Sequence, residues 1–247
     1  MTFCLAMKVS EGLVCIADTR ITTGLECITV KKVSVYQGDK RSLFVMTSGL
    51  RSVRDKALTY FEELVDQAEE PFDRVFKAVN AFAEMVRRVA GEDKAALAES
   101  GFSFNMHTLI GGQLSGDKEH KLYLLYPQGN WVEIVEGTPY CIIGASGYGK
   151  PIMDRTLKYN DSLQFALKVG CLAFDSTRIS ASDVGFPVDI VLYQRGSFKL
   201  AEYRLEEDDL HDVSHWWQER LRDSVNELPA HSLSKLYDRF TNDTQGV

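Results

Sequence analysis

Thr2, the threonine that follows the first methionine, offers a nucleophile and a base in one residue. If Met1 is removed, Thr2 carries a free α-amine beside its own hydroxyl. An α-amine has an ordinary pKa of about 7.7–8.0, so it can accept the hydroxyl proton near neutral pH, which a lysine amine at about 10.4 does poorly. The β-branched side chain also restricts the hydroxyl to few rotamers. Such a residue suits acyl transfer, provided that a nearby cation lowers the proton affinity of the site.

Two charged residues near the start of the chain could supply this electrostatic setting. Asp18 stands in the sequence Ala-Asp-Thr-Arg at the end of an apolar run, and Lys32 directly precedes the next such run. Lys31 is the alternative cation. Because neighbouring residues of a strand point to opposite faces of the sheet, only one of the two lysines can reach a common site with Thr2.

A glycine-rich segment over residues 144–150 resembles two known motifs and completes neither. A P-loop would need Ser or Thr after its lysine to hold magnesium, but Pro151 supplies neither a hydroxyl nor an N–H. A nucleophile elbow around Ser146 would need a final glycine, which Tyr148 replaces. A strand-to-helix turn with proline at the first helical position is the simpler interpretation.

The histidines and cysteines form weaker patterns. His211 and His215 lie one helical turn apart, as in a zinc-binding H-E-x-x-H motif, but aspartate replaces the glutamate and only His231 follows as a third ligand. The two neighbouring tryptophans indicate a packing helix instead. Cys4 and His107 could form a thiol–imidazole pair, although cysteines on buried strands are usually inert.

The composition excludes several classes of protein. The 247 residues are 45% hydrophobic and 26% charged, which is typical of a globular protein with a substantial core. A net charge of -7 argues against nucleic acid and anionic membranes as partners. No apolar run approaches the roughly 18 residues of a membrane span. The five cysteines form no C-x-x-C pair, and the start of the chain lacks the features of a secretion signal, so we expect a cytoplasmic protein.

The order of the apolar patterns predicts two sheets, each with its own pair of helices. Strands are expected over residues 3–9, 13–19, 25–30, 34–36, 42–48, 104–112, 121–127, 130–136, 140–146, 187–194 and 197–205. Helices are expected over residues 53–65, 72–89, 151–157, 163–174 and 206–224. Because strands and helices come in blocks, we predict an α+β fold, a four-layer αββα sandwich. Residues 1–247 form one predicted domain with a C-terminal helix and tail at 206–247, of which 225–247 is a loose tail.

These features together resemble the proteasome β-type threonine peptidases, which are N-terminal nucleophile hydrolases. The family pattern has an N-terminal threonine, an Ala-Asp-Thr-Arg strand end, a lysine followed by valine and a strand, and a strand ending in a small residue and glycine, here Ser48 and Gly49. All four occur in this order. The glycine-rich segment, the D-S-T-R-I-S run and the E-E-D-D before a tryptophan-containing helix are similar to the bacterial ancestral β subunits (Anbu) of this family. The resemblance covers residues 2 to about 224.

The resemblance implies a role for each residue of the site. Thr2 would be the nucleophile, and Lys32 would be the cation because it is the lysine followed directly by valine and the strand. Asp18 would position Lys32. The backbone N–H of Gly49 would stabilise the tetrahedral oxyanion. Each role is also chemically sensible by itself.

Further site residues follow from the same resemblance. Ser146 aligns with the serine that hydrogen-bonds the threonine amine, with one extra residue in the local spacing. Asp183 is the nearest match to a second acidic residue of the family, in a sequence that departs from the family's Asp-x-x-Ser pattern. The positions that line the family's substrate pocket are Ile21, Val30 and Thr47.

The implied function is hydrolysis of peptide bonds through an ester on Thr2 after removal of Met1, without a cofactor or metal. The substrate would be a peptide or an unfolded protein. Two alternatives remain open. The same nucleophile would serve an amidase that acts on a small amide or isopeptide. The chain could also be a non-catalytic scaffold subunit, although the presence of both Asp18 and Lys32 speaks against it.

The resemblance also implies a homo-oligomer, a ring or spiral of many subunits that pack through their helical layers. Trp216 and Trp217 are adjacent on a predicted helix, about 100° apart, so one of them should lie at the edge of the core-facing stripe and seek a partner. A second group of apolar residues fits either the core or an interface: Phe72, Phe76, Phe82 and Met85.

Overall fold

The computed structural model describes residues 2–23, 26–67 and 72–245, and it divides into two compact units at residues 209 and 210. Met1, whose removal the family resemblance implies, lies outside the described residues. The described residues of the first unit, up to Asp209, form both five-stranded sheets and the helices α1 to α4. The second unit, from Leu210, is helical.

The first sheet is built around the N-terminal hairpin. Its strands are all paired antiparallel, in the order β10-β1-β2-β11-β12. Their bounds are β1 Phe3–Val9, β2 Gly12–Asp18, β10 Tyr140–Gly144, β11 Val188–Gln194 and β12 Leu200–Leu205. Every residue of β1 and β2 is buried, because both faces of these central strands are covered. The start of β1 and the end of β2 therefore meet at one end of the sheet, through the pairing of Cys4 with Ala17.

The second sheet is also antiparallel, in the order β5-β6-β7-β8-β9. Its strands are β5 Val33–Gly38, β6 Arg41–Gly49, β7 Met106–Leu114, β8 Lys121–Leu125 and β9 Trp131–Glu133. A small hairpin, β3 Arg20–Thr23 and β4 Glu26–Thr29, connects the two sheets. On β6, Leu43 and Val45 pack toward the helices, whereas Phe44 and Met46 belong to the core that contains residues of both sheets. This alternation is what a strand buried on both faces requires.

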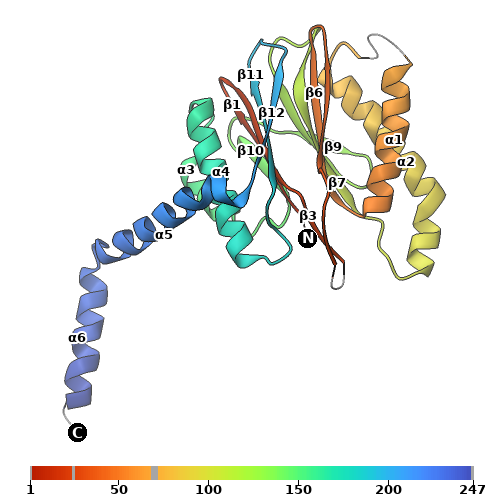
Figure 1. Cartoon of the computed structure of the whole chain (residues 1–247). Helices are drawn as coiled ribbons and strands as arrows, with labels where there is room; N and C mark the ends of the chain where they lie inside the picture. Colours follow the sequence, from red (N-terminus) through yellow and green to blue (C-terminus); the bar gives the residue numbers. More distant parts are fainter. Residues whose placement is uncertain (1, 24–25, 68–71, 246–247) are drawn as a thin grey trace. The chain divides into compact units, whose positions relative to one another are not determined.

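Two pairs of helices cover the outer faces of the sheets (Figure 1). α1 (Arg51–Asp66) and α2 (Val75–Glu99) pack on the second sheet, and α3 (Lys150–Thr156) and α4 (Leu163–Ser180) cover the first. α1 presents buried residues at helical spacing: Val53, Ala57, Phe61 and Val65. The predicted four-layer αββα sandwich is confirmed.

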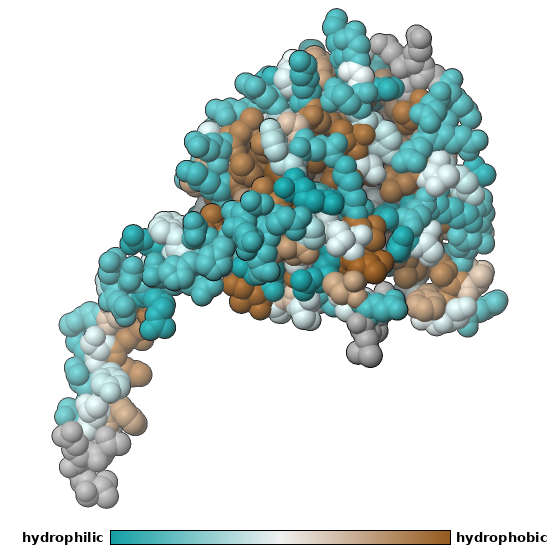
Figure 2. All heavy atoms as spheres, viewed as in Figure 1, coloured by the Kyte–Doolittle hydropathy of each residue, from teal (hydrophilic) through white to brown (hydrophobic). Residues whose placement is uncertain are grey.

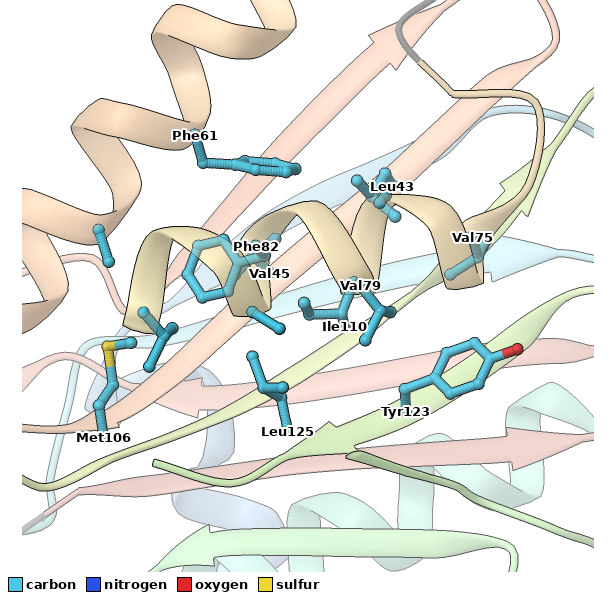
Figure 3. Packing of buried hydrophobic residues seen from close by; sticks show 14 of the residues in the cluster. Leu43, Val45, Phe61, Val75, Val79, Phe82, Met106, Ile110, Tyr123 and Leu125 are labelled. Carbon is cyan, nitrogen blue, oxygen red and sulfur yellow. The ribbon is translucent and has the colours of Figure 1, made fainter. Parts of the chain in front are cut away.

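The aromatic residues of the predicted second helix belong to the core of the first unit. Phe82 is fully buried beside Phe61, with ring centroids 5.2 Å apart in an edge-to-face arrangement (Figure 3). Phe72 stacks on Phe61 at 6.0 Å. Phe76 and Met85 pack against the same cluster. Of the two interpretations for this group, the structure supports the core.

The structure of the second unit differs from the prediction for the C-terminal residues. α5 spans His211–Asn226, after a 3-10 turn at Glu207–Leu210, and is shorter at its start than the predicted helix over 206–224. Residues 231–245 form a further helix, α6 (His231–Gln245), where the sequence predicted a loose tail. The polar composition concealed a regular apolar spacing in this segment. Trp216 is 50% exposed and stacks against Trp217 at 6.4 Å, as expected for one tryptophan at the edge of a stripe.

No helix among the described residues is long and apolar enough to cross a membrane.

Buried His120 should make the stability of the fold depend on pH. Its Nε2 lies 2.8 Å from the carbonyl oxygen of Val9, and burial lowers the pKa of the imidazole to about 4. The unfolded chain, with a histidine pKa near 6.5, binds more protons than the folded chain between these values, so stability is lost as the pH falls from about 6.5 toward 4. From pH 7 to pH 5 this group should remove about 2 kcal/mol from the free energy of unfolding.

Urea denaturation at pH 7 and pH 5 measures this loss. His120→Gln keeps a donor for the Val9 carbonyl but does not titrate, so its loss over the same range should be smaller by about 2 kcal/mol. Equal losses in the two proteins would show that His120 does not cause the acid sensitivity.

Candidate active site

A buried ion pair lies where the first sheet meets the small hairpin. The Nζ of Lys32 lies 2.7 Å from Oδ1 of Asp18, and the two side chains are only 3% and 0% exposed. The same ammonium donates a hydrogen bond of 2.7 Å to the backbone carbonyl of Arg20. Burial raises the pKa of the Asp18 carboxyl, and the charge of Lys32 opposes that rise. Because a buried charge is costly without a partner, each residue stabilises the charged form of the other.

The local fold explains why residues 18 and 32 meet although 14 positions separate them in the chain. β2 ends at Asp18, and the next residue, Thr19, donates from its N–H and its hydroxyl to the carbonyl of Pro187. The hairpin of β3 and β4 then returns the chain, and the N–H of Val30 donates to the carbonyl of Thr19. Lys32 therefore enters beside the end of β2.

The ion pair is connected to the start of β1. The N–H of Phe3 donates a hydrogen bond of 2.7 Å to Oδ1 of Asp18, the oxygen that also accepts from Lys32. Phe3 directly follows Thr2, which is half-buried. The structure therefore brings Thr2, Asp18 and Lys32 to one end of the first sheet.

Lys31 points elsewhere. It forms a salt bridge with Glu202 on β12, and its side chain is 48% exposed. Of the two candidate lysines, the structure places Lys32 beside Asp18.

Gly144 brings the end of β10 against the backbone of Thr2. The N–H of Ala145 donates a hydrogen bond of 2.6 Å to the carbonyl of Thr2. Gly144 has a φ of +89°, and a Cβ at this position would lie 1.9 Å from that carbonyl oxygen and 3.1 Å from Oγ of Ser48. Ser48, near the end of β6, therefore lies beside the same point. Only glycine permits this meeting of β1, β6 and β10.

We expect Gly144→Ala to lower the free energy of unfolding by about 2 kcal/mol or more, because it adds both backbone strain and a collision with Thr2. Gly147→Ala is the matched control. Gly147 is exposed in the same loop, and a Cβ there would meet no neighbouring atom within 4 Å, so this variant should lose less than about 1 kcal/mol. Urea denaturation of both variants tests the difference, and equal losses would contradict it.

Gly49, the predicted oxyanion donor, is exposed at the end of β6. Its φ is +141°, and a Cβ would lie 2.1 Å from the carbonyl oxygen of Asn105, so a side chain is excluded here too. The following N–H, of Leu50, donates to that Asn105 carbonyl at 2.9 Å. The end of β6 is thereby fixed against the start of β7.

The remaining predicted residues lie in loops and strands around this end. Ser146 is half-buried and its carbonyl accepts from the N–H of Lys150 at the start of α3. Asp183 is half-buried in the loop between α4 and β11. Ile21 and Val30 are half-buried at the small hairpin, and Thr47 is buried on β6.

Arg20 was missed by the sequence analysis as a separate site residue. Besides its carbonyl contact with Lys32, its guanidinium donates to the carbonyl of Ser182, and a Cβ on Gly185 would lie 2.4 Å from it. Arg20 therefore holds the loop that carries Asp183 against the end of β2. Its place in the Ala-Asp-Thr-Arg sequence was the available signal.

The other motifs form no competing site. The thiol of Cys4 lies 3.8 Å from the carbonyl oxygen of Thr47, and burial raises its pKa far above the ordinary value, whereas the ring of His107 packs edge-on against Tyr126. Gly149 and Pro151 open α3 as a strand-to-helix turn, with the proline in its first turn. Within residues 2–23, 26–67 and 72–245, no group of three or more His, Cys, Asp or Glu side chains could hold a metal ion.

Comparison with known proteins identifies the family of this chain. The family model described as "Proteasome subunit" matches residues 2–213. The chain belongs to the proteasome subunit family. Comparison with curated proteins found no match.

Solved structures of family members called Anbu, or ancestral β subunit, are similar over most of this chain. The Anbu of Yersinia bercovieri is 31% identical, with a TM-score of 0.85, over 92% of this chain and 98% of its own. The Anbu of Pseudomonas aeruginosa, described as a helical assembly, is 31% identical, with a TM-score of 0.86, over 92% and 97%. A mutant Anbu from Hyphomicrobium sp. strain MC1 is 29% identical, with a TM-score of 0.85, over 92% and 99%.

Proposed function

We propose that this proteasome-family subunit is a peptidase that uses Thr2 as its N-terminal nucleophile after removal of Met1. The observation that carries this proposal is the buried link from Lys32 through Asp18 to the N–H of Phe3, with both contacts 2.7 Å long. A lysine held this close to the start of β1, with its charge compensated by a fully buried carboxylate, favours removal of a proton from a neighbouring hydroxyl.

The proposed reaction transfers an acyl group through Thr2. The α-amine accepts the hydroxyl proton while Oγ bonds to the carbonyl carbon of the peptide. The N–H of Gly49 donates to the resulting oxyanion. Collapse of this intermediate breaks the C–N bond, and the proton passes from the ammonium group to the departing amine. The same amine then takes a proton from water while the water oxygen bonds to the ester carbon. When the C–Oγ bond breaks, this proton passes from the ammonium group to Oγ, which restores the Thr2 hydroxyl and releases the acid.

Supporting residues complete the proposal. Ser146 would hydrogen-bond the α-amine and so orient it toward the hydroxyl. Asp183 would be the second acidic residue of the site, in the loop that Arg20 holds against the end of β2. The side chains of Ile21, Val30 and Thr47 would line the pocket for the residue before the cleaved bond.

Intact mass spectrometry tests two requirements of this mechanism, the removal of Met1 and a reactive Thr2. The purified protein should have the mass of the chain without Met1, because an amide nitrogen on Thr2 could not act as a base. A peptide epoxyketone, which forms stable bonds to both the hydroxyl and the α-amine, should then add the mass of one inhibitor, located at Thr2 by proteolytic mapping. A chain that retains Met1, or an adduct at another residue, would contradict the proposal.

Substrate panels separate the alternative activities. Turnover of small amides or isopeptides without turnover of peptides would indicate an amidase on the same nucleophile. Loss of Met1 together with no adduct and no turnover would indicate a non-catalytic subunit.

We also propose that the chain forms a homo-oligomer that confines the active threonines. The similarity to an Anbu described as a helical assembly supports this proposal. Light scattering coupled to size-exclusion chromatography should give a mass that is several times 27.8 kDa, the mass of one chain. One species near that mass at micromolar concentration would contradict the proposal.

A further inference from the structure

α6 is an addition to the part of the chain that matches the family. The part of the chain that matches the family model ends at residue 213, and α6 covers His231–Gln245. The three solved relatives are covered over 97–99% of their own lengths, but they cover only 92% of this chain. Part of this chain therefore has no counterpart in them, and α6 needs an explanation of its own.

One side of α6 is apolar and exposed. Leu233, Leu236, Tyr237 and Phe240 are 60%, 69%, 67% and 60% exposed. They recur at i, i+3, i+4 and i+7, which places them on one face of the helix. Figure 2 shows this face as a hydrophobic strip along α6. An exposed, contiguous apolar strip of this kind marks an interaction surface.

We propose that this strip binds the same strip on α6 of a second copy, with the two helices antiparallel. The proposal rests on the homo-oligomer proposed above. If the two-fold axis passes between Leu236 and Tyr237, Leu236 of each helix lies opposite Tyr237 of the other. It also sets Leu233 of each helix against Phe240 of the other. Each contact then occurs twice, as the two-fold symmetry of an isologous interface requires.

The charges of α6 fit a second copy better than a membrane surface. Lys235 and Asp238 lie on the face opposite the strip, so they stay in water when two strips meet. An antiparallel pair also sets the positive end of each helix dipole beside the negative end of the other. A helix that binds anionic lipid carries an excess of Lys and Arg, whereas in α6 Lys235 and Arg239 are balanced by Asp238 and Asp243.

The size of the strip indicates how strongly two α6 helices can bind each other. Four large apolar side chains on each helix would bury roughly 1,000 Å² in total, which is at the small end of specific interfaces. A helix of 15 residues is also marginal by itself. The contact is therefore weak between free chains and strong between subunits that other contacts already hold near each other, where the effective concentration is high. α6 would link such subunits and extend the assembly.

A pair of variants with equal charge changes tests the strip. Leu236→Asp places a carboxylate at its centre, and Asn242→Asp places one at an exposed position on the opposite face. Light scattering over a range of concentrations should show that Leu236→Asp raises the concentration for half-assembly at least tenfold, whereas Asn242→Asp changes it less than twofold. Assembly of Leu236→Asp at the wild-type concentration would overturn the inference. Assembly lost equally in both variants would also overturn it, and a monomeric wild type would contradict the homo-oligomer itself.

Disulfide cross-linking tests the antiparallel arrangement in the assembled full chain. The background is Cys27→Ser, which removes an exposed cysteine. A mixture of Leu233→Cys and Phe240→Cys chains should form mixed dimers under mild oxidation, and Leu233→Cys alone should form at least fivefold less dimer. Efficient cross-linking of Leu233→Cys with itself would show a parallel pair, and no cross-linking in any combination would overturn the contact.

Discussion

Thr2→Ala is expected to lower peptide hydrolysis by at least about 10³-fold, because it removes the proposed nucleophile and leaves only the proposed oxyanion donor and substrate pocket. The change deletes two side-chain atoms at a half-buried position before the start of β1. The carbonyl of residue 2 accepts from the N–H of Ala145, and the N–H of Phe3 donates to Oδ1 of Asp18. Neither hydrogen bond uses the side chain of residue 2, so both remain. Stability should therefore change by less than about 1 kcal/mol.

Thr2→Ser is the control for this loss. The serine hydroxyl can still attack, but without the methyl group it samples more rotamers, so activity should fall yet stay clearly above that of Thr2→Ala. Peptide turnover and thermal unfolding of the three proteins measure both effects. Turnover by Thr2→Ala near the wild-type rate would point to another nucleophile, and a large drop in melting temperature would show that the loss has a structural cause.

The sequence could predict the layers of the fold because its core signals are strong and local. On β6 the apolar residues from Leu43 to Met46 form a run that suits a strand covered on both faces. On α1 the spacing of Val53, Ala57 and Phe61 marks one buried helix face. The α6 segment was misjudged because its few apolar residues are separated by Ser, Lys and Asp, and polarity concealed their regular spacing.

The candidate site could be predicted only in part. The resemblance, not the spacing, selected Lys32 over Lys31, because both precede the same strand and alternation alone left them equivalent. The role of Arg20 depends on a carbonyl and on a loop 162 residues away, and no local pattern reports such a contact. The need for glycine at position 144 likewise comes from the approach of Thr2 across the sheet.

Lys32→Ala should remove most activity and also destabilise the fold. Asp18 is fully buried and would lose the ammonium 2.7 Å away, and breaking one partner from such a pair costs about 3–5 kcal/mol. Loss of the cation proposed to activate Thr2 should lower turnover by about 10²-fold or more. Lys31→Ala is the matched control, because its exposed bridge to Glu202 should contribute less than about 1 kcal/mol.

The stability deficit of Lys32→Ala should depend on pH in a way that identifies its cause. Burial raises the pKa of Asp18, and removal of Lys32 removes the charge that opposes the rise. The folded variant then keeps the Asp18 proton at pH values where the unfolded chain, with a carboxyl pKa near 3.9, has released it. A folded state that binds more protons loses stability as the pH rises, so the deficit should be largest near pH 7 and shrink toward pH 4.

Urea denaturation of wild type, Lys31→Ala and Lys32→Ala at pH 4.5 and 7 measures this stability deficit. A deficit that is the same at both pH values would mean that lost packing, rather than the uncompensated carboxylate, destabilises the variant. Inactive Lys31→Ala beside active Lys32→Ala would show that the other lysine serves Thr2.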